Sequence, residues 1–116
     1  MKSSFFAMCL CAAVCLLTAV QGQAAGYSSP AKISHIGTPE GDGKFFIRGT
    51  WNNIDTCGSV DKFLVGYHAV DTVTSREMKL SLVLTAFSTG QTVELYLDGC
   101  QNNYPVVKGI YLPSRS

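Results

Sequence analysis

The chain has 116 residues, which is enough for one domain. Its nine Lys and Arg side chains nearly balance eight Asp and Glu side chains, and loss of Lys2 with a cleaved leader would leave a formally neutral protein. A neutral surface argues against nucleic acid as a ligand, because phosphate binding depends on basic side chains that release counterions. No run of like charges indicates a helix that lies on a membrane surface.

The amino end has the pattern of a secretory signal peptide. Lys2 precedes an apolar run over residues 5–20, and a small-residue cleavage site follows this run. Cleavage after Ala24 fits the pattern, with cleavage after Gly22 as the alternative. The run is shorter than the ~20 apolar residues that a comfortable membrane span needs, and no later stretch is long enough. We therefore expect a signal peptide over residues 1–24 and a single secreted or periplasmic domain over residues 25–116.

Cys57 and Cys100 are the two cysteines that remain once the leader is removed. An exported protein meets an oxidising environment, so we predict a disulfide between them, with two free thiols as the alternative. A metal site is not expected, because the mature chain has no C-x-x-C motif and its histidines, His35 and His68, lie far from any ligand spacing. We also expect no cofactor.

The first half of the domain is predicted to consist of strands. Residues 26–30 form a short polar leader that we expect to be flexible. Strands are predicted over residues 31–37, 44–51 and about 60–70, separated by a Pro- and Gly-rich turn at 38–43 and a loop at 52–59. Glycines within predicted strands indicate the bends of a small closed barrel: Gly49, Gly66 and Gly109.

The stretch from residue 75 to residue 100 predicts a helix, a turn and a strand. Thr74 and Glu77 have the spacing of a capping box, and Gly90 marks the end of the helix. Apolar residues cover most of the helix circumference, so we expect it to be buried: Met78, Leu80, Leu82, Val83, Leu84 and Phe87. After Gly90 the period changes to two, with one apolar face made of Val93, Leu95 and Leu97. A last strand is predicted over residues 104–112.

The order of elements is therefore β-β-β-α-β-β, with the helix between the third and fourth strands. This is the order of the OB-fold, a five-stranded, partly open barrel. We predict a mainly β, OB-fold-like barrel with one helix and one disulfide. A small sheet with one helix packed across it is the alternative.

Several short motifs resemble a group of small, exported and largely uncharacterised bacterial proteins. The group pairs a glycine–tryptophan strand before one cysteine with a helix, a G-x-x-V strand, a second G-C and a terminal Y-P strand. Here these motifs are Gly49-Thr50-Trp51, Cys57-Gly58, Gly90 to Val93, Gly99-Cys100 and Tyr104-Pro105. The resemblance covers most of the mature chain and implies fold and disulfide more than activity. In architecture alone, such a protein is also similar to the pentameric cell-binding subunits of bacterial toxins, so an oligomer is possible.

Two amide-rich loops are the candidate ligand site. OB-folds bind oligosaccharides and oligonucleotides on strands two and three and in neighbouring loops. Amides offer paired donors and acceptors to sugar hydroxyls, and an aromatic face packs on a pyranose ring. The candidate residues are Trp51, Asn52, Asn53, Asp55, Gln101, Asn102, Asn103 and Tyr104. The simpler interpretation is a disulfide-fixed polar turn with a core tryptophan.

A protein-binding inhibitor or an accessory subunit of an exported complex is the alternative function. An apolar strip along Phe46, Tyr96 and Tyr111 would favour it, if these side chains face outward. Catalysis is less well supported, because His68 could meet Asp61 or Asp71 but lies in no recognised motif. The sequence therefore predicts a non-enzymatic binding module for a carbohydrate or a protein.

Overall fold

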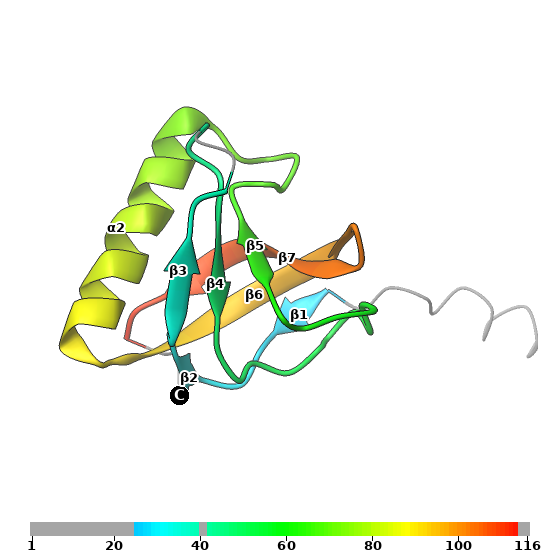
Figure 1. The fold of residues 1–116 in the computed structure, drawn as a ribbon, viewed down its shortest axis with the longest axis horizontal. Coiled ribbons are helices and arrows are strands. Elements are labelled where there is room, and N and C mark those ends of the chain that lie inside the picture. Colours follow the sequence, from blue (N-terminus) through cyan, green and yellow to red (C-terminus); the bar gives the residue numbers. More distant parts are fainter. Residues whose placement is uncertain (1–24, 40–41, 114–116) are drawn as a thin grey trace, which may run out of the picture.

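The computed structural model describes residues 25–39 and 42–113 of the chain. The predicted signal peptide and its cleavage site thus lie outside the described residues. The elements are β1 (Gly26–Tyr27), β2 (Ala31–Lys32), β3 (His35–Gly37), β4 (Phe45–Arg48), β5 (Phe63–Val65), α2 (Val73–Thr89), β6 (Thr92–Gln101) and β7 (Tyr104–Tyr111). The domain is therefore mainly β with a single long helix between β5 and β6 (Figure 1).

The strands form a seven-stranded sheet in the order β1-β6-β7-β5-β4-β3, and β2 also pairs with β6. Strands β5 and β7 are parallel, whereas the other neighbours are antiparallel. This sheet is not the closed five-stranded barrel of the prediction. The predicted first strand is interrupted at Ile33 and Ser34, so that its halves pair with different partners: β2 with β6, and β3 with β4. The predicted flexible leader instead supplies β1.

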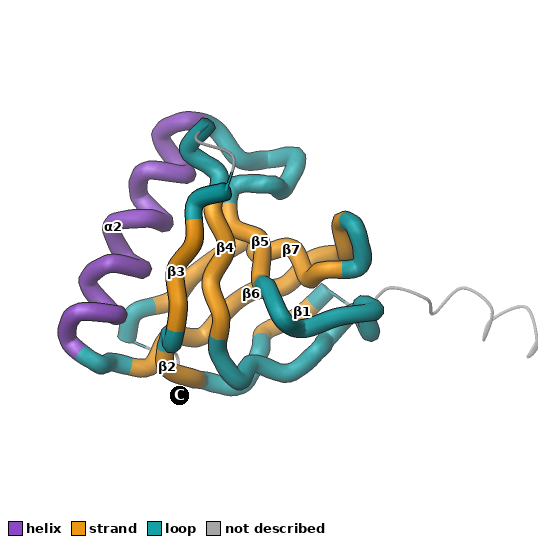
Figure 2. Tube along the Cα trace, in the orientation of Figure 1, coloured by secondary structure: helices purple, strands orange, loops and turns teal. Residues whose placement is uncertain are grey.

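The hydrophobic core lies between the two halves of the bent sheet. Strands β3, β4 and β5 cross in front of β6 and β7, and α2 runs along one side (Figures 1 and 2). The alternation predicted for β6 is confirmed, because Val93, Leu95 and Leu97 are fully buried. They pack in one cluster with Phe45 and Ile47 of β4.

The N-cap of the helix lies two residues before the predicted one. Its N-cap is Thr72, whose Oγ1 accepts the backbone N–H of Ser75 at 3.1 Å, while Ser75 Oγ accepts the N–H of Thr72 at 2.8 Å. The prediction of Thr74 and Glu77 was wrong because a serine hydroxyl takes the place of the carboxylate in this box. The helix end was predicted correctly, since Gly90 is the C-cap with φ of 67°.

Contrary to the prediction, most of the apolar surface of α2 is not buried. Val83 and Ala86 are the buried residues of the helix, whereas Met78 is 64% exposed, Leu84 50% and Phe87 48%. The reason is that α2 lies along a single side of the sheet, so one stripe of the helix is covered and the flanks are not. The apolar pattern correctly indicated a helix but overestimated its burial.

Two glycines account for the shortness of the central strands. Gly66 has φ of +90° and ends β5, which is much shorter than predicted. Gly49 follows β4, and a Cβ at this position would lie 2.7 Å from the backbone oxygen of Lys32. The close approach of the chain to Lys32 therefore requires a glycine at residue 49.

Candidate functional site

The two amide-rich loops meet, as predicted. The disulfide between Cys57 and Cys100 joins them, with a Cα–Cα distance of 5.7 Å. Asp55 Oδ2 accepts the backbone N–H of Gly99 at 2.7 Å, and the N–H of Ser59 donates to the oxygen of Asn103 at 2.9 Å. The disulfide prediction is thus confirmed, and the loop residues 49–62 are fixed to the hairpin of β6 and β7.

Trp51 belongs to the core and not to a ligand site. It is 3% exposed, its Nε1 donates to the oxygen of Val93 at 3.0 Å, and its ring meets Phe63 edge-on at 5.2 Å between centroids. A sugar ring has no access to such a face. The placement of Trp51 at a glycan site is therefore corrected: the large apolar ring gains more from burial between β4 and β6 than it would from exposure.

The side chains of Asn52, Asn53 and Asp55 are occupied with the backbone. Asn53 both donates to the oxygen and accepts from the nitrogen of Cys57, at 2.7 and 2.8 Å. Asn52 Oδ1 accepts the N–H of Ser29 at 2.8 Å. Asp55 is 7% exposed and holds the N–H of Gly99. These polar groups stabilise the loop, which agrees with the simpler interpretation of its composition.

The remaining amides form the hairpin turn between β6 and β7. Asn102 and Asn103 have φ of 51° and 69°, in the left-handed region that asparagine tolerates, and both are exposed together with Gln101. Backbone geometry thus explains the asparagines at this turn. Tyr104, the last predicted residue, is half-buried and leads away from the turn onto the face of the sheet.

Tyr104 lies in a row of aromatic and basic side chains that we call the basic aromatic strip: Phe46, Arg48, Lys62 and Tyr104. The Lys62 ammonium lies 4.9 Å from the ring centre of Phe46 and 5.6 Å from that of Tyr104. The Arg48 guanidinium lies 5.4 Å from the Phe46 ring. The strip lies on the face of β4, β5 and β7 that points away from the main core. Phe46 and Arg48 alternate with the buried Phe45 and Ile47, and Lys62 directly precedes the buried Phe63.

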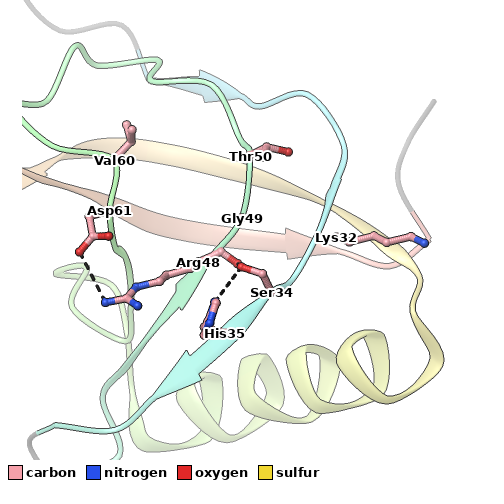
Figure 3. A pocket seen from close by; sticks show the side chains of 8 residues that line it. All are labelled: Lys32, Ser34, His35, Arg48, Gly49, Thr50, Val60 and Asp61. Carbon is pink, nitrogen blue, oxygen red and sulfur yellow. Dashed lines mark hydrogen bonds and ion pairs between the residues drawn. The ribbon is translucent and has the colours of Figure 1, made fainter.

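A hollow of about 560 Å³ adjoins the strip at Arg48; we call it the basic hollow. Figure 3 shows Arg48 extended toward Asp61, with Lys32 on the other side and His35 beside Ser34. Arg48 Nη2 lies 3.5 Å from Asp61 Oδ2, and both side chains are partly exposed. The lining consists of Lys32, Ser34, His35, Arg48, Gly49, Thr50, Val60 and Asp61.

Positive charge is in excess in this region. Lys32, Arg48 and Asp61 line the basic hollow, Arg48 is the one of the two cations that pairs with Asp61, and Lys62 adds a further positive charge on the strip. Within residues 25–39 and 42–113, Lys62 has no carboxylate within ion-pair distance. An exposed pair such as Arg48 with Asp61 contributes at most about 1 kcal/mol, so a ligand carboxylate can compete for the guanidinium. The region is thus suited to an anionic group next to a flat apolar surface.

Both histidines are hydrogen-bonded to neighbouring residues. His68 Nδ1 accepts the N–H of Val70 at 3.2 Å, so that Nε2 carries the proton that it donates to Asp98, 2.8 Å away. Both ring nitrogens of His68 are therefore engaged. Ser34 Oγ donates to the oxygen of Arg48 at 3.1 Å, which leaves His35 Nδ1, 3.0 Å away, to donate to Ser34 and not to deprotonate it. The contact of His68 with Asp71 that the sequence allowed is made by the backbone of His68 and not by its ring: its N–H donates to Asp71 Oδ2 at 3.1 Å, and its oxygen accepts the N–H of Asp71 at 2.9 Å.

The predicted apolar strip is divided between two places. Tyr96 and Tyr111 meet Tyr27 of β1, with ring centres 4.8 and 5.5 Å from that of Tyr27. Phe46 lies on β4, which β5 and β7 separate from β6 in the sheet, and it contacts Lys62 and Arg48. The alternation of residues 45–48 places Phe46 and Arg48 on the same face of the strand. That Lys62 and Tyr104 lie next to them depends on the strand order, which the alternation does not contain.

The part of the chain that the structure describes contains no group of three or more His, Cys, Asp or Glu side chains arranged to hold a metal ion. No helix among these residues is long and apolar enough to cross a membrane. No protein-family model, curated protein or solved structure matches this chain.

Proposed function

We propose that this protein is an exported, non-enzymatic binding module that holds an acidic oligosaccharide across the basic aromatic strip and the basic hollow. The observation that carries the proposal is Lys62, whose ammonium lies between the rings of Phe46 and Tyr104 and has no carboxylate partner in the described part of the chain. The predicted leader and the disulfide support export.

The chemistry of the strip matches both parts of an acidic sugar. The apolar face of a pyranose ring packs on an aromatic ring, and a uronate or sulfate group pairs with a lysine or arginine. Phe46 and Tyr104 supply the rings, and Arg48 and Lys62 supply the charges next to Phe46. Arginine can bind a carboxylate through two parallel hydrogen bonds, which gives orientation as well as affinity.

The basic hollow extends this surface by the space of a small ligand. Its volume of about 560 Å³ falls within the roughly 300–1,000 Å³ that small-molecule sites occupy. Ser34 and Thr50 place hydroxyls on the rim beside Lys32 and Arg48, where they can bond to sugar hydroxyls. A chain of two or more sugars would therefore have contacts on both the strip and the hollow.

The strand order supports an OB-like interpretation of the open sheet. The parallel pairing of β5 with β7, the antiparallel pairing of β4 with its neighbours, and the helix between β5 and β6 suit such a barrel with its first strand split into β2 and β3. OB-folds bind their ligands on strands two and three. These correspond to β4 and β5, next to which the basic aromatic strip lies. We include in this proposal the architectural similarity to toxin cell-binding subunits and the oligomer that this similarity implies.

One observation favours a protein partner as the second candidate function. The outer flank of α2 exposes Val73, Leu84 and Phe87, with exposed fractions of 62%, 50% and 48%. Apolar side chains that gather on one surface are typical of interaction sites. An inhibitor or an accessory subunit would use this flank, whereas a glycan would use the strip.

A glycan array with matched neutral and acidic oligosaccharides tests the primary proposal. Purified protein is applied as wild type, as Lys62→Gln, and as Lys44→Gln, a control with the same change of charge at a lysine that Asp42 already accompanies at 3.7 Å. We expect retention on acidic glycans, weakened about tenfold by Lys62→Gln through loss of one charge-assisted contact, and unchanged by Lys44→Gln.

Three results would contradict this function. Equal loss with both lysine variants would indicate a general charge effect, and retention on neutral glycans alone would remove the role of Lys62. Binding of single-stranded DNA in preference to every glycan would indicate that the same surface binds nucleic acid, since bases also stack on aromatic rings. The overall balance of nine basic and eight acidic residues argues against that result.

A further inference from the structure

A second hollow, of about 390 Å³, is lined by tyrosines from three strands. We call it the tyrosine hollow; its lining is Tyr27 of β1, Tyr96 of β6, and Lys108, Gly109 and Tyr111 of β7. Tyr27 pairs with Tyr96 in the sheet, and Tyr96 pairs with Gly109 on its other side. The hollow is thus built on a continuous part of the sheet, and none of its residues belongs to the basic aromatic strip.

The three rings surround the space instead of stacking on each other. The ring planes of Tyr27 and Tyr96 are inclined by 81°, and those of Tyr27 and Tyr111 by 57°. Tyr27 is 42% exposed, so the hollow opens to solvent beside it. Inclined rings with exposed edges offer apolar carbon to the ring of a ligand.

Gly109 creates the hollow, although neither backbone conformation nor crowding demands glycine there. A Cβ on residue 109 would lie 3.6 Å from Tyr111 Cε2 and 3.6 Å from Tyr96 Cβ, which is ordinary contact, and residue 109 is not among the glycines with positive φ. Glycine inside a strand weakens it by roughly 0.5–1 kcal/mol relative to a residue with a side chain. Glycine at residue 109 therefore leaves room next to the Tyr96 and Tyr111 side chains that no steric constraint requires.

Lys108 decides the charge of the occupant. Its ammonium lies 5.8 Å from the ring centre of Tyr96 and has no carboxylate within ion-pair distance among the described residues. Glu94, opposite Tyr111 in the sheet, is 7% exposed and already has a partner. A cationic ligand of the kind that aromatic cages bind would be repelled by Lys108. A ring with apolar faces and an anionic substituent is the matching chemistry.

We propose that the tyrosine hollow is a second carbohydrate site, which takes a single uronic acid residue with its ring against the tyrosines and its carboxylate at Lys108. The proposal rests on the proposed function for its class of ligand, but on different residues. With the basic aromatic strip, it makes the chain bivalent for acidic glycans. Two sites on one chain raise the apparent affinity for a polymer well above that for a monosaccharide.

The tyrosines themselves report on both sites in one experiment. The chain has five tyrosines, of which Tyr27, Tyr96 and Tyr111 line the hollow and Tyr104 belongs to the strip. Protein from the full-length gene is labelled with ring-¹³C tyrosine, and its signals are assigned with single Tyr→Phe variants. Methyl β-glucuronide is then titrated, with methyl β-glucoside as the uncharged control.

The decisive variant is Gly109→Val, which adds a side chain beside the hollow at a position where a Cβ meets only ordinary contacts. We expect the glucuronide to shift the signals of Tyr27, Tyr96 and Tyr111 in the wild type, and to lose this effect in Gly109→Val while Tyr104 behaves as before. Tyr27→Ala, which truncates an exposed ring on the edge strand, gives the same test if the valine disturbs the fold.

Each outcome separates this inference from the proposed function. Shifts at Tyr104 without shifts at the hollow would overturn the second site and leave the strip intact. Shifts at the hollow without shifts at Tyr104 would support the second site and count against the strip. Equal shifts with methyl glucoside would refute the role of Lys108, and shifts that persist in both Gly109→Val and Tyr27→Ala would refute the location.

Discussion

Replacement of Lys79 by methionine removes one half of a buried ion pair at the start of α2. Lys79 Nζ bonds to Asp71 Oδ1, and the two side chains are 11% and 2% exposed. Asp71 also accepts the N–H of His68 at 3.1 Å and the hydroxyl of Ser75 at 3.0 Å. Methionine keeps the length and the apolar contacts of the lysine stem but leaves the carboxylate buried without its cation.

The expected loss of unfolding free energy is about 3 kcal/mol. Breaking a buried pair by removal of one partner costs roughly 3–5 kcal/mol, and the two remaining hydrogen bonds of Asp71 favour the lower end. In a domain of this size, such a loss lowers the melting temperature by roughly 12–24 °C. It is a large share of the roughly 5–15 kcal/mol that stabilise a typical domain.

Urea denaturation followed by fluorescence measures this loss, because Trp51 is the single tryptophan of the chain and is 3% exposed. Lys32→Met, at an exposed lysine, is the control and should change stability by no more than about 0.5 kcal/mol. The double variant Lys79→Met with Asp71→Asn should recover part of the stability, since the buried charge is gone. A Lys79→Met protein within about 1 kcal/mol of the wild type, or a double variant less stable than Lys79→Met, would refute the reasoning.

Three further predictions concern the disulfide, the helix cap and Gly49. Cys57→Ala should cost about 4 kcal/mol by the loop-entropy estimate for a separation of 43 residues, and a melting curve that is identical under reducing and oxidising conditions would contradict this. Thr72→Ala should lower stability by about 1 kcal/mol while Thr74→Ala leaves it nearly unchanged, which chemical denaturation of the two variants will compare. Gly49→Ala should lower the melting temperature, because its Cβ would lie 2.7 Å from the backbone oxygen of Lys32; the matched Gly109→Ala has its nearest contacts at 3.6 Å, and an equal effect of both would refute the argument from close approach.

The sequence by itself determined the local features of this protein. The end of α2 at Gly90 follows from the left-handed conformation that glycine adopts without strain. The inward face of β6 follows from its alternation, and the disulfide was predicted from the two cysteines that follow the predicted leader. The helix end and the buried face of β6 depend on residues close in sequence. The disulfide has only one possible pairing between Cys57 and Cys100, so none of the three features required knowledge of the strand order.

Only the tertiary structure decided where the long-range contacts fall. The amide-rich loops were predicted to meet, but the burial of Trp51 depends on the distance between β4 and β6, which no local pattern contains. The exposed flank of α2 depends on how much of the helix the sheet can cover. The basic aromatic strip joins Phe46, Lys62 and Tyr104 because β7 lies parallel to β5 and next to it. Pairing between distant segments is set by packing of the whole chain. For this reason the sequence named Phe46 and Tyr104 as candidates for two different surfaces and did not predict that both lie next to Lys62.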